Sequence, residues 1–269
     1  MANQDTTWDE EFLEIFLGPI RKCATYKPAF GQGKGDGYSL DQFQELYGRD
    51  PLYRWLGLDD SRVYSAHKAA GGLTSVYRQI GIGGERLFRG VIKNSLEIDE
   101  SDLNWSYEYD KPNGKPGTHT LDAMIPLEAL GRQPSKRLKN WLVSASAKMG
   151  QRREVGERLT GVVFEVRQGY KSADSKRQNA DLRFGMRAYQ ADLLPAFSVL
   201  STQVSDPVSR RYRADGMLML TGTEQGDSLS STFSFCREIV DYDLASFFSR
   251  NTEAIKAEVV TVVGALLNP

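Results

Sequence analysis

The sequence predicts an α/β fold in which helices flank a mixed central sheet and the N-terminal third is mostly helical. Two observations favour this class. Apolar residues recur at helical spacing through most of residues 1–100, and strand and helix patterns alternate through residues 101–225. Residues 226–269 are expected to form C-terminal helices. Because no internal repeat or low-complexity linker divides the 269 residues, we expect one domain over residues 1–269.

Several helices are predicted in the first third of the chain. Apolar residues at helical spacing predict a helix over Thr7–Arg21, and Ser39 with Gln42 forms a capping box for a second helix. The glycines of residues 80–84 are expected to separate two later helices. Further helices are predicted at Asp50–Leu58, Ser61–Gln79 and Glu85–Leu96.

Strands are predicted where apolar and polar residues alternate with a period of two. Leu103–Tyr109 and Thr118–Ile125 flank a turn rich in proline and glycine, which predicts a β-hairpin. Leu159–Gly169 is rich in β-branched and aromatic residues, as a strand buried on both faces requires. The remaining predicted elements are helices at Ser135–Met149, Ser172–Leu193 and Val208–Arg213 and strands at Leu194–Gln203 and Met217–Thr221.

The composition excludes several functional classes. Cys23 and Cys236 are the only cysteines, and their surroundings lack metal-ligand spacing, which argues against a disulfide framework or a zinc cluster. No apolar run is long enough to span a membrane, and the first residues are polar and acidic. We therefore expect a cytoplasmic protein with no membrane partner. A net charge of −1 argues against a non-specific polycation.

Two carboxylates in predicted strands are candidates for a metal site. The strand period places Asp122 on the face opposite the apolar residues of its strand, and Glu165 is an acid within an otherwise apolar strand. Because Mg²⁺ prefers carboxylate oxygens held on rigid elements, we expect it at these two residues. Arg167 would lie beside Glu165 and stabilise charge on a phosphate. A plain surface ion pair on an edge strand is the alternative for Glu165 and Arg167.

A basic segment follows the acidic strand and leads into the next predicted helix. Backbone amides at a helix N-terminus add affinity for anions, so this segment suits phosphate binding; a solvated helix face is the alternative. Asn179 would read bases only if this helix end entered the major groove. The candidate DNA-binding residues of the segment are Lys171, Ser172, Lys176, Arg177 and Asn179.

The segment Glu165–Asp181, with the sequence EVRQGYKSADSKRQNAD, resembles the signature stretch of ApaLI-like type II restriction endonucleases. The resemblance extends over about Thr118 to Arg250. It implies a restriction-endonuclease-like PD-(D/E)xK fold and Mg²⁺-dependent cleavage of double-stranded DNA at a short palindromic sequence. It also implies a homodimer and a bacterial or archaeal source.

Carried over residue by residue, the resemblance makes Asp122 the first metal ligand and Glu165 the second. The chain departs from the family pattern because Arg167 stands where lysine is usual and Leu121 stands where proline precedes the aspartate. Either Arg167 takes the electrostatic role of the lysine, or Lys171 reaches into the site. Arginine stays protonated and is a poor general base, so the nucleophile would then be a metal-bound water.

Other charged residues have a functional and a structural interpretation. Glu85 would join the metal site, or is an acid favoured by the helix dipole in a first turn. Lys111 and Lys115 would contact a DNA groove from the hairpin tip, or are simply solvated. Arg211 and Arg213 would contact the DNA backbone, or form ion pairs within their helix.

A homodimer requires a contact surface, and the C-terminal helices are candidates for it. Their apolar residues would form the dimer contact or ordinary core. These residues are Phe247, Phe248, Val259, Val260, Val262 and Val263.

The sequence therefore suggests three alternative functions. The leading hypothesis is a Mg²⁺-dependent type II restriction endonuclease. The departure at Arg167 motivates a second one, a catalytically inactive nuclease-fold protein that binds DNA. A third is an unrelated α/β protein whose acidic strand and basic helix form a structural ion network. Salt-dependent DNA affinity and cleavage in Mg²⁺ distinguish the three.

Overall fold

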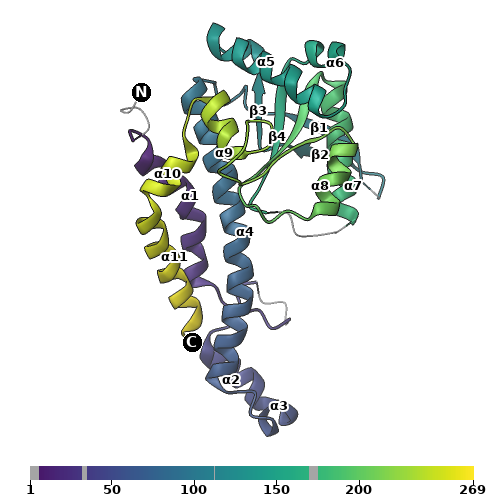
Figure 1. The fold of residues 1–269 in the computed structure, drawn as a ribbon. Coiled ribbons are helices and arrows are strands. Elements are labelled where there is room, and N and C mark those ends of the chain that lie inside the picture. Colours follow the sequence, from purple (N-terminus) through teal and green to yellow (C-terminus); the bar gives the residue numbers. More distant parts are fainter. Residues whose placement is uncertain (1–5, 32–34, 112, 170–174) are drawn as a thin grey trace. The chain divides into compact units, whose positions relative to one another are not determined.

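The computed structural model describes residues 6–31, 35–111, 113–169 and 175–269, with the backbone alone for residues 175–179. The chain packs as two compact units, and Figure 1 labels their α-helices and the strands β1 to β4. The first unit comprises Met1–Phe12 and Gly84–Ser249, and the second comprises Leu13–Gly83 and Arg250–Pro269. This division does not test the expectation of one restriction-endonuclease-like domain, which stays a prediction.

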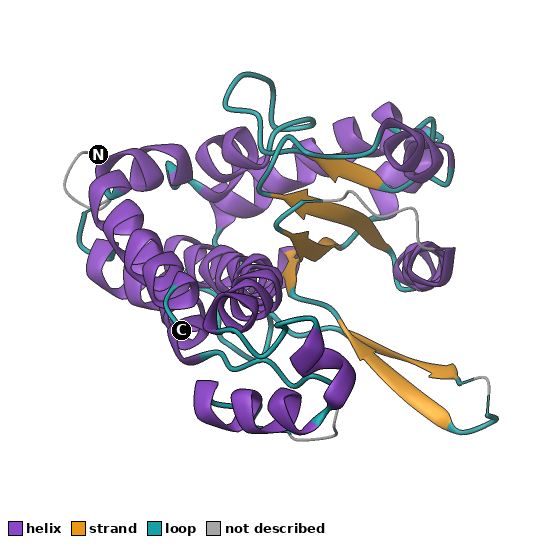
Figure 2. Ribbon diagram, turned by 90° about the horizontal axis from the view of Figure 1, so that it is seen from below, coloured by secondary structure: helices purple, strands orange, loops and turns teal. Residues whose placement is uncertain are grey.

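A four-stranded mixed sheet with the order β3-β4-β5-β6 lies at the centre of the first unit (Figure 2). Strand β4 pairs antiparallel with β3 and parallel with β5, and β5 pairs parallel with β6. β4 and β5 are almost entirely buried because helices cover both faces of the sheet. The mixed α/β class is confirmed. The strands are β3 (Ala123–Pro126), β4 (Gly161–Arg167), β5 (Leu193–Val199) and β6 (Leu218–Leu220).

Helices α7 (Ser175–Gln190) and α8 (Asp206–Ala214) cover one face of this sheet. Phe184 from α7 and Tyr212 from α8 are fully buried with Val163 and Phe197 in one apolar cluster. Phe197 stacks on Tyr212 with 4.8 Å between the ring centroids. Both helices are therefore fixed to the face that also carries Glu165 and Arg167.

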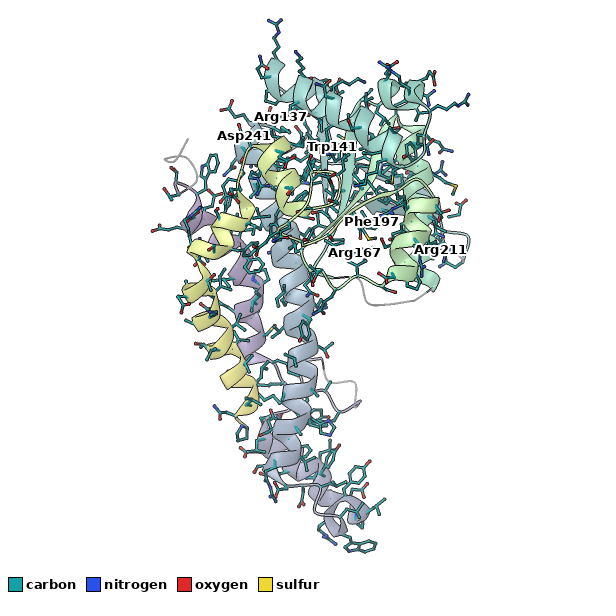
Figure 3. All side chains as sticks on the ribbon, in the orientation of Figure 1. Arg137, Trp141, Arg167, Phe197, Arg211 and Asp241 are labelled. Carbon is teal, nitrogen blue, oxygen red and sulfur yellow. The ribbon has the colours of Figure 1, made fainter. Side chains whose placement is uncertain are left out.

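Aromatic contacts cover the opposite face of the sheet. The Phe164 ring of β4 lies 5.1 Å from Phe88 of α4 (Ser61–Leu96) and 5.2 Å from Phe235 of α9 (Thr232–Phe235). Helix α5 (Arg132–Lys148) reaches the same group, since its Trp141 lies 4.9 Å from Phe235. Figure 3 shows Trp141 beside the labelled Arg137, whose Nε donates a hydrogen bond to the Ile239 carbonyl.

Strands β1 (Ser106–Asp110) and β2 (Pro116–Thr120) form a separate antiparallel ribbon, which confirms the predicted hairpin (Figure 2). The prediction of one strand over Thr118–Ile125 was wrong, because this segment is divided between β2 and β3. The backbone changes partners at the break. Leu121 N donates to Trp105 O at 2.9 Å, whereas Asp122 N donates to Phe164 O, in the main sheet, at 3.1 Å.

The second unit is helical. The predicted capping box is confirmed, since Ser39 Oγ accepts a hydrogen bond from Gln42 N and Gln42 Oε1 accepts one from Ser39 N. The Phe43 and Tyr47 rings, 4.4 Å apart, begin an aromatic cluster within this unit. Its elements are most of α1 (Asp9–Arg21), a 3-10 turn (Lys22–Thr25), α2 (Leu40–Arg49), α3 (Pro51–Trp55), the N-terminal part of α4, and α11 (Thr252–Leu267).

The expected helix break at residues 80–84 was wrong, because α4 runs unbroken from Ser61 to Leu96. The glycines there allow close helix packing. A Cβ atom at Gly83 would lie 2.3 Å from the Phe16 carbonyl oxygen of α1, so glycine allows the two backbones to touch. A sequence pattern cannot distinguish such a glycine from one that ends a helix.

Four short helical elements complete the first unit: a 3-10 turn (Leu127–Ala129), α6 (Arg153–Arg158), a π-helical turn (Cys236–Val240) and α10 (Leu244–Arg250). Phe247 of α10 and Val262 of α11 are fully buried, so at these positions the core interpretation of the C-terminal helices is confirmed. Val260 of α11 is 70% exposed.

None of the helices in the described ranges is long and apolar enough to cross a membrane.

We expect Gly83→Ala to lower the free energy of unfolding by about 1–3 kcal/mol, because the new methyl group meets a backbone oxygen that has little room to move. Gly264 lies inside α11 with open space around its Cα. Gly264→Ala is the matched control and should raise the free energy of unfolding by up to about 1 kcal/mol through helix propensity. Urea denaturation followed by circular dichroism measures both, and equal effects would contradict the close packing of α1 on α4.

Candidate active site

Asp122, Glu165 and Arg167 lie together at one edge of the main sheet. Asp122 directly precedes β3, and two hydrogen bonds hold it against β4. Its N–H donates to Phe164 O at 3.1 Å, and its Oδ2 accepts from Val166 N at 2.6 Å. Since Phe164 and Val166 flank Glu165 in β4, the two acids predicted as metal ligands come from adjacent strands and are held at the same level of the sheet.

Asp122 lies in a strongly negative environment. It is half-buried, and burial, followed by the negative charges of Glu165 and Glu85, raises the pKa of Asp122 to about 8. The Val166 N–H and the charge of Arg167 act in the opposite direction. Burial also raises the pKa of Glu85, on α4. Glu85 therefore lies close enough to Asp122 to influence its ionisation. A bound cation would stabilise the charged forms of Asp122, Glu165 and Glu85.

Arg167 lies between two acids in the interior. Its Nη2 is 3.0 Å from Glu165 Oε1 and 2.9 Å from Asp181 Oδ1, and only 6% of its side chain is exposed. The Tyr212 hydroxyl donates to the other Asp181 oxygen at 2.5 Å. The guanidinium carbon lies 5.7 Å from the centre of the Phe197 ring on the neighbouring strand (Figure 3). Arg167 thus links Glu165 to a buried acid.

The alternative of a surface ion pair on an edge strand was wrong in its location. The pair of Glu165 and Arg167 exists, but β4 is an inner strand of the sheet and α7 covers it. Sequence reasoning also missed the role of Asp181 in this network. A signal was available, because Asp181 shares a helical stripe with the buried Phe184 and Ala188. An acid on the apolar face of a helix requires a buried partner.

His119 connects the ribbon to the same acids. Its Nε2 lies 3.8 Å from Glu165 Oε2, and its Nδ1 is 2.9 Å from the Tyr107 hydroxyl. Burial lowers the pKa of His119, which favours the neutral imidazole, and burial raises the pKa of Tyr107 to about 12. His119 thus hydrogen bonds within the ribbon and contacts Glu165, and the sequence alone did not reveal the second contact.

Arg89 is a second residue that sequence reasoning missed. Its Nη1 donates to the Asp122 carbonyl at 3.0 Å and to the Leu103 carbonyl at 3.1 Å. Its Nη2 lies 2.7 Å from Glu100 Oε1. Arg89 therefore holds the backbone of Asp122 from outside the sheet. Its place one helical turn after Glu85 on α4 was the available signal.

The donor types at this edge fit Mg²⁺, which binds carboxylate oxygens. Among the residues that the structure describes, no three His, Cys, Asp or Glu side chains are gathered as a ready metal site. Burial is the main cause of the raised pKa values of Asp122 and Glu85, and at Asp122 the negative charges of Glu165 and Glu85 add to it, so a divalent cation would stabilise the ionised carboxylates. Asp122, Glu165 and Glu85 are therefore the residues that would hold it.

No protein-family model, no curated protein and no solved structure matches the chain. The resemblance of Glu165–Asp181 to ApaLI-like endonucleases accordingly stays a prediction. Function is therefore inferred from the geometry around Asp122 and Glu165.

The predicted DNA-binding residues fall into three groups. Lys171 and Ser172 lie outside the described residues. Arg211 and Arg213 are exposed on α8, whose opposite side is buried, and Lys111 and Lys115 are exposed at the ribbon tip. The residues in the first turns of α7, for which the backbone alone is described, are Lys176, Arg177 and Asn179.

We expect Arg167→Ala to lower the free energy of unfolding by about 3–5 kcal/mol, because it leaves Asp181 as an uncompensated charge in the interior. Arg153→Ala on α6 is the control. Arg153 also forms an ion pair, 2.7 Å from Glu157, but at the exposed surface, and its loss should change stability little. Chemical denaturation of both variants measures the difference, and a similar small effect would show that the buried network is not formed.

We expect Asp122→Asn to stabilise the protein increasingly as the pH rises from about 4 to about 8. The pKa of Asp122 is raised by folding, so within this range the folded protein retains a proton that the unfolded chain has lost. Its stability therefore falls with rising pH, and asparagine removes this dependence.

Denaturation in EDTA across this pH range tests the expectation. Asp102→Asn, at an exposed loop position, is the control and should follow the wild type. A constant difference between wild type and Asp122→Asn at all pH values would show that Asp122 is not protonated on folding.

Proposed function

We propose that the chain is a type II restriction endonuclease that hydrolyses phosphodiester bonds of double-stranded DNA with Mg²⁺. The observation that carries the proposal is the bonding of Asp122 to both residues flanking Glu165, with Arg167 next to that glutamate. This places two acids of adjacent strands, and a cation, at one edge of a mixed sheet. A PD-(D/E)xK fold is the finer assignment that we propose for it.

The acids and the arginine take different roles in this proposal. Asp122 and Glu165 would hold the metal, joined by Glu85. Mg²⁺, when bound, would neutralise charge on the phosphate and favour deprotonation of a water. Arg167 forms ion pairs with Glu165 and Asp181. We therefore assign it the role of orienting Glu165, rather than the direct phosphate contact expected from the sequence. Lys171 stays the candidate for that contact.

The proposed DNA contacts and dimer follow from the substrate. Basic residues of α7 and α8 would bind phosphates, which position the duplex without reading its sequence. A two-fold homodimer would present one site to each strand of a palindrome, because the symmetry of the protein then matches that of the DNA.

A second candidate function is a nuclease-fold protein that binds DNA without cutting it. The observation that favours it is the buried ion pair at Arg167, since an arginine enclosed by two acids cannot serve as the exposed lysine of the motif does.

We expect purified protein to cut unmodified plasmid and phage DNA into discrete fragments in Mg²⁺ but not in EDTA. Glu165→Gln and Asp122→Asn should reduce the cleavage rate on the order of 100-fold or more, because each removes negative charge that would hold the metal. The control is Glu154→Gln, at an exposed position of α6, which should cut like the wild type. Gel electrophoresis measures the rates, and sequencing of the ends identifies the target.

Two outcomes would contradict cleavage. DNA binding in Ca²⁺ with no cutting in Mg²⁺ would support the inactive DNA-binding protein. Absence of salt-dependent DNA binding under all conditions would exclude both candidates and leave a structural ion network.

A further inference from the structure

The ribbon of β1 and β2 has two faces of different character. The face turned inward carries aromatic residues, which are half-buried, and the buried Gly117. The outward face is polar except for one proline, and all of its residues are exposed. These residues are Ser106, Glu108, Asp110, Pro116, Thr118 and Thr120.

The inner face anchors the ribbon to the main sheet. Tyr107 packs against the buried cluster under α7 and α8. The Arg183 guanidinium of α7 lies 5.7 Å from the centre of the Tyr109 ring. A Cβ atom at Gly117 would lie 2.9 Å from that ring, so glycine allows Tyr109 to lie across the ribbon. Because two isolated strands are barely stable in water, these contacts hold the ribbon in place.

The outer face is an ordered set of hydrogen-bonding groups. Ser106 stands opposite Thr120, and Glu108 stands opposite Thr118, in the register of the two strands. Hydroxyls donate and accept, and a carboxylate accepts. The strands extend away from the main sheet (Figure 2) and end in a turn flanked by the exposed cations Lys111 and Lys115.

We propose that this ribbon enters the major groove of double-stranded DNA and reads base edges with its outer face. The inference rests on the proposed function and adds the element that determines sequence specificity. The major groove admits a two-stranded ribbon. Glutamate accepts a hydrogen bond from cytosine N4, and serine and threonine hydrogen bond to donors or acceptors on the base edges. The tip lysines complement the charge of the phosphates that border the groove.

The chemistry of the outer face favours DNA over a protein partner. Stable protein interfaces have an apolar centre with aromatic anchors, whereas the outer face offers Pro116 as its apolar residue and turns its tyrosines inward. A groove floor instead presents donors and acceptors in rows, as the cross-strand pairs of the ribbon do.

The ribbon also lies next to the proposed site of cleavage. Tyr107 and His119 are register partners on its inner face, and His119 Nε2 lies 3.8 Å from Glu165 Oε2. The strand that makes base contacts with its outer face would therefore contact Glu165, a proposed metal ligand, with its inner face. Cleavage would depend on how the ribbon seats in the groove.

The test uses the full chain, a duplex DNA library with randomised central base pairs, Ca²⁺ in place of Mg²⁺, and sequencing of the bound fraction. Glu108→Gln should move the preferred base at one position from cytosine toward adenine, which glutamine recognises. The double variant Glu108→Ala/Thr118→Ala should lose discrimination by about ten-fold for each lost base contact. Its affinity should keep the salt dependence of the wild type.

Variants of the tip and of a remote surface separate phosphate contact from base reading. Lys111→Gln/Lys115→Gln should weaken binding to all sequences alike and lower the slope of log K against log salt concentration by about 1 for each lysine. Lys136→Gln on α5 and Glu154→Gln on α6 are exposed controls outside the ribbon and should bind like the wild type. Circular dichroism verifies that every variant is folded.

The outcomes separate the two proposals. Outer-face variants that select the same sequences as the wild type would overturn base reading by the ribbon and leave the nuclease proposal standing. A wild-type protein without salt-dependent affinity for the library would overturn both. Altered base preference in Glu108→Gln, with unaltered preference in Glu154→Gln, would support the ribbon as the specificity element.

Discussion

The exchange of backbone partners at Asp122 is the constraint on which the rest of the site depends. Leu121 is hydrogen-bonded to Trp105 of the ribbon side, whereas Asp122 is hydrogen-bonded to the two β4 residues that flank Glu165. Arg89 holds the carbonyl of the same residue. These bonds bring the ribbon, the main sheet and α4 together at a single position. A small shift there would move both acids and the inner face of the ribbon.

The site balances its charges in two different ways. On the side of α7 and α8, Arg167 compensates Glu165 and Asp181 within an interior closed by aromatic rings. On the side of α4, Asp122 and Glu85 lie together in a poorly hydrated place, and Asp122 is held largely in its protonated form near neutral pH. On the side of α7 and α8 the charges are therefore compensated without a ligand. On the side of α4 a bound cation would stabilise the ionised carboxylates.

Much of the fold was predictable because strong local patterns coincided with burial. The β-branched run that forms β4 and the capping box at Ser39 are examples. The predicted residues Asp122, Glu165 and Arg167 do lie together. The local pattern indicates that Asp181 faces the core and that Arg89 lies one turn from Glu85, but it does not indicate their partners, because Arg167 and Asp122 belong to other elements of the chain. Continuous α4 was missed because Gly83 serves packing rather than helix termination.

The ribbon has a further consequence, which concerns solubility. Two paired strands leave an open backbone edge on each side, and open edges invite pairing with strands of other molecules. Charged side chains at exposed positions oppose such association, and Glu108, Asp110, Lys111 and Lys115 occupy such positions along this hairpin. The main sheet limits the same hazard by ending in two short strands, β3 and β6. Removal of charge from the hairpin would therefore invite aggregation even where the folded structure is unaltered.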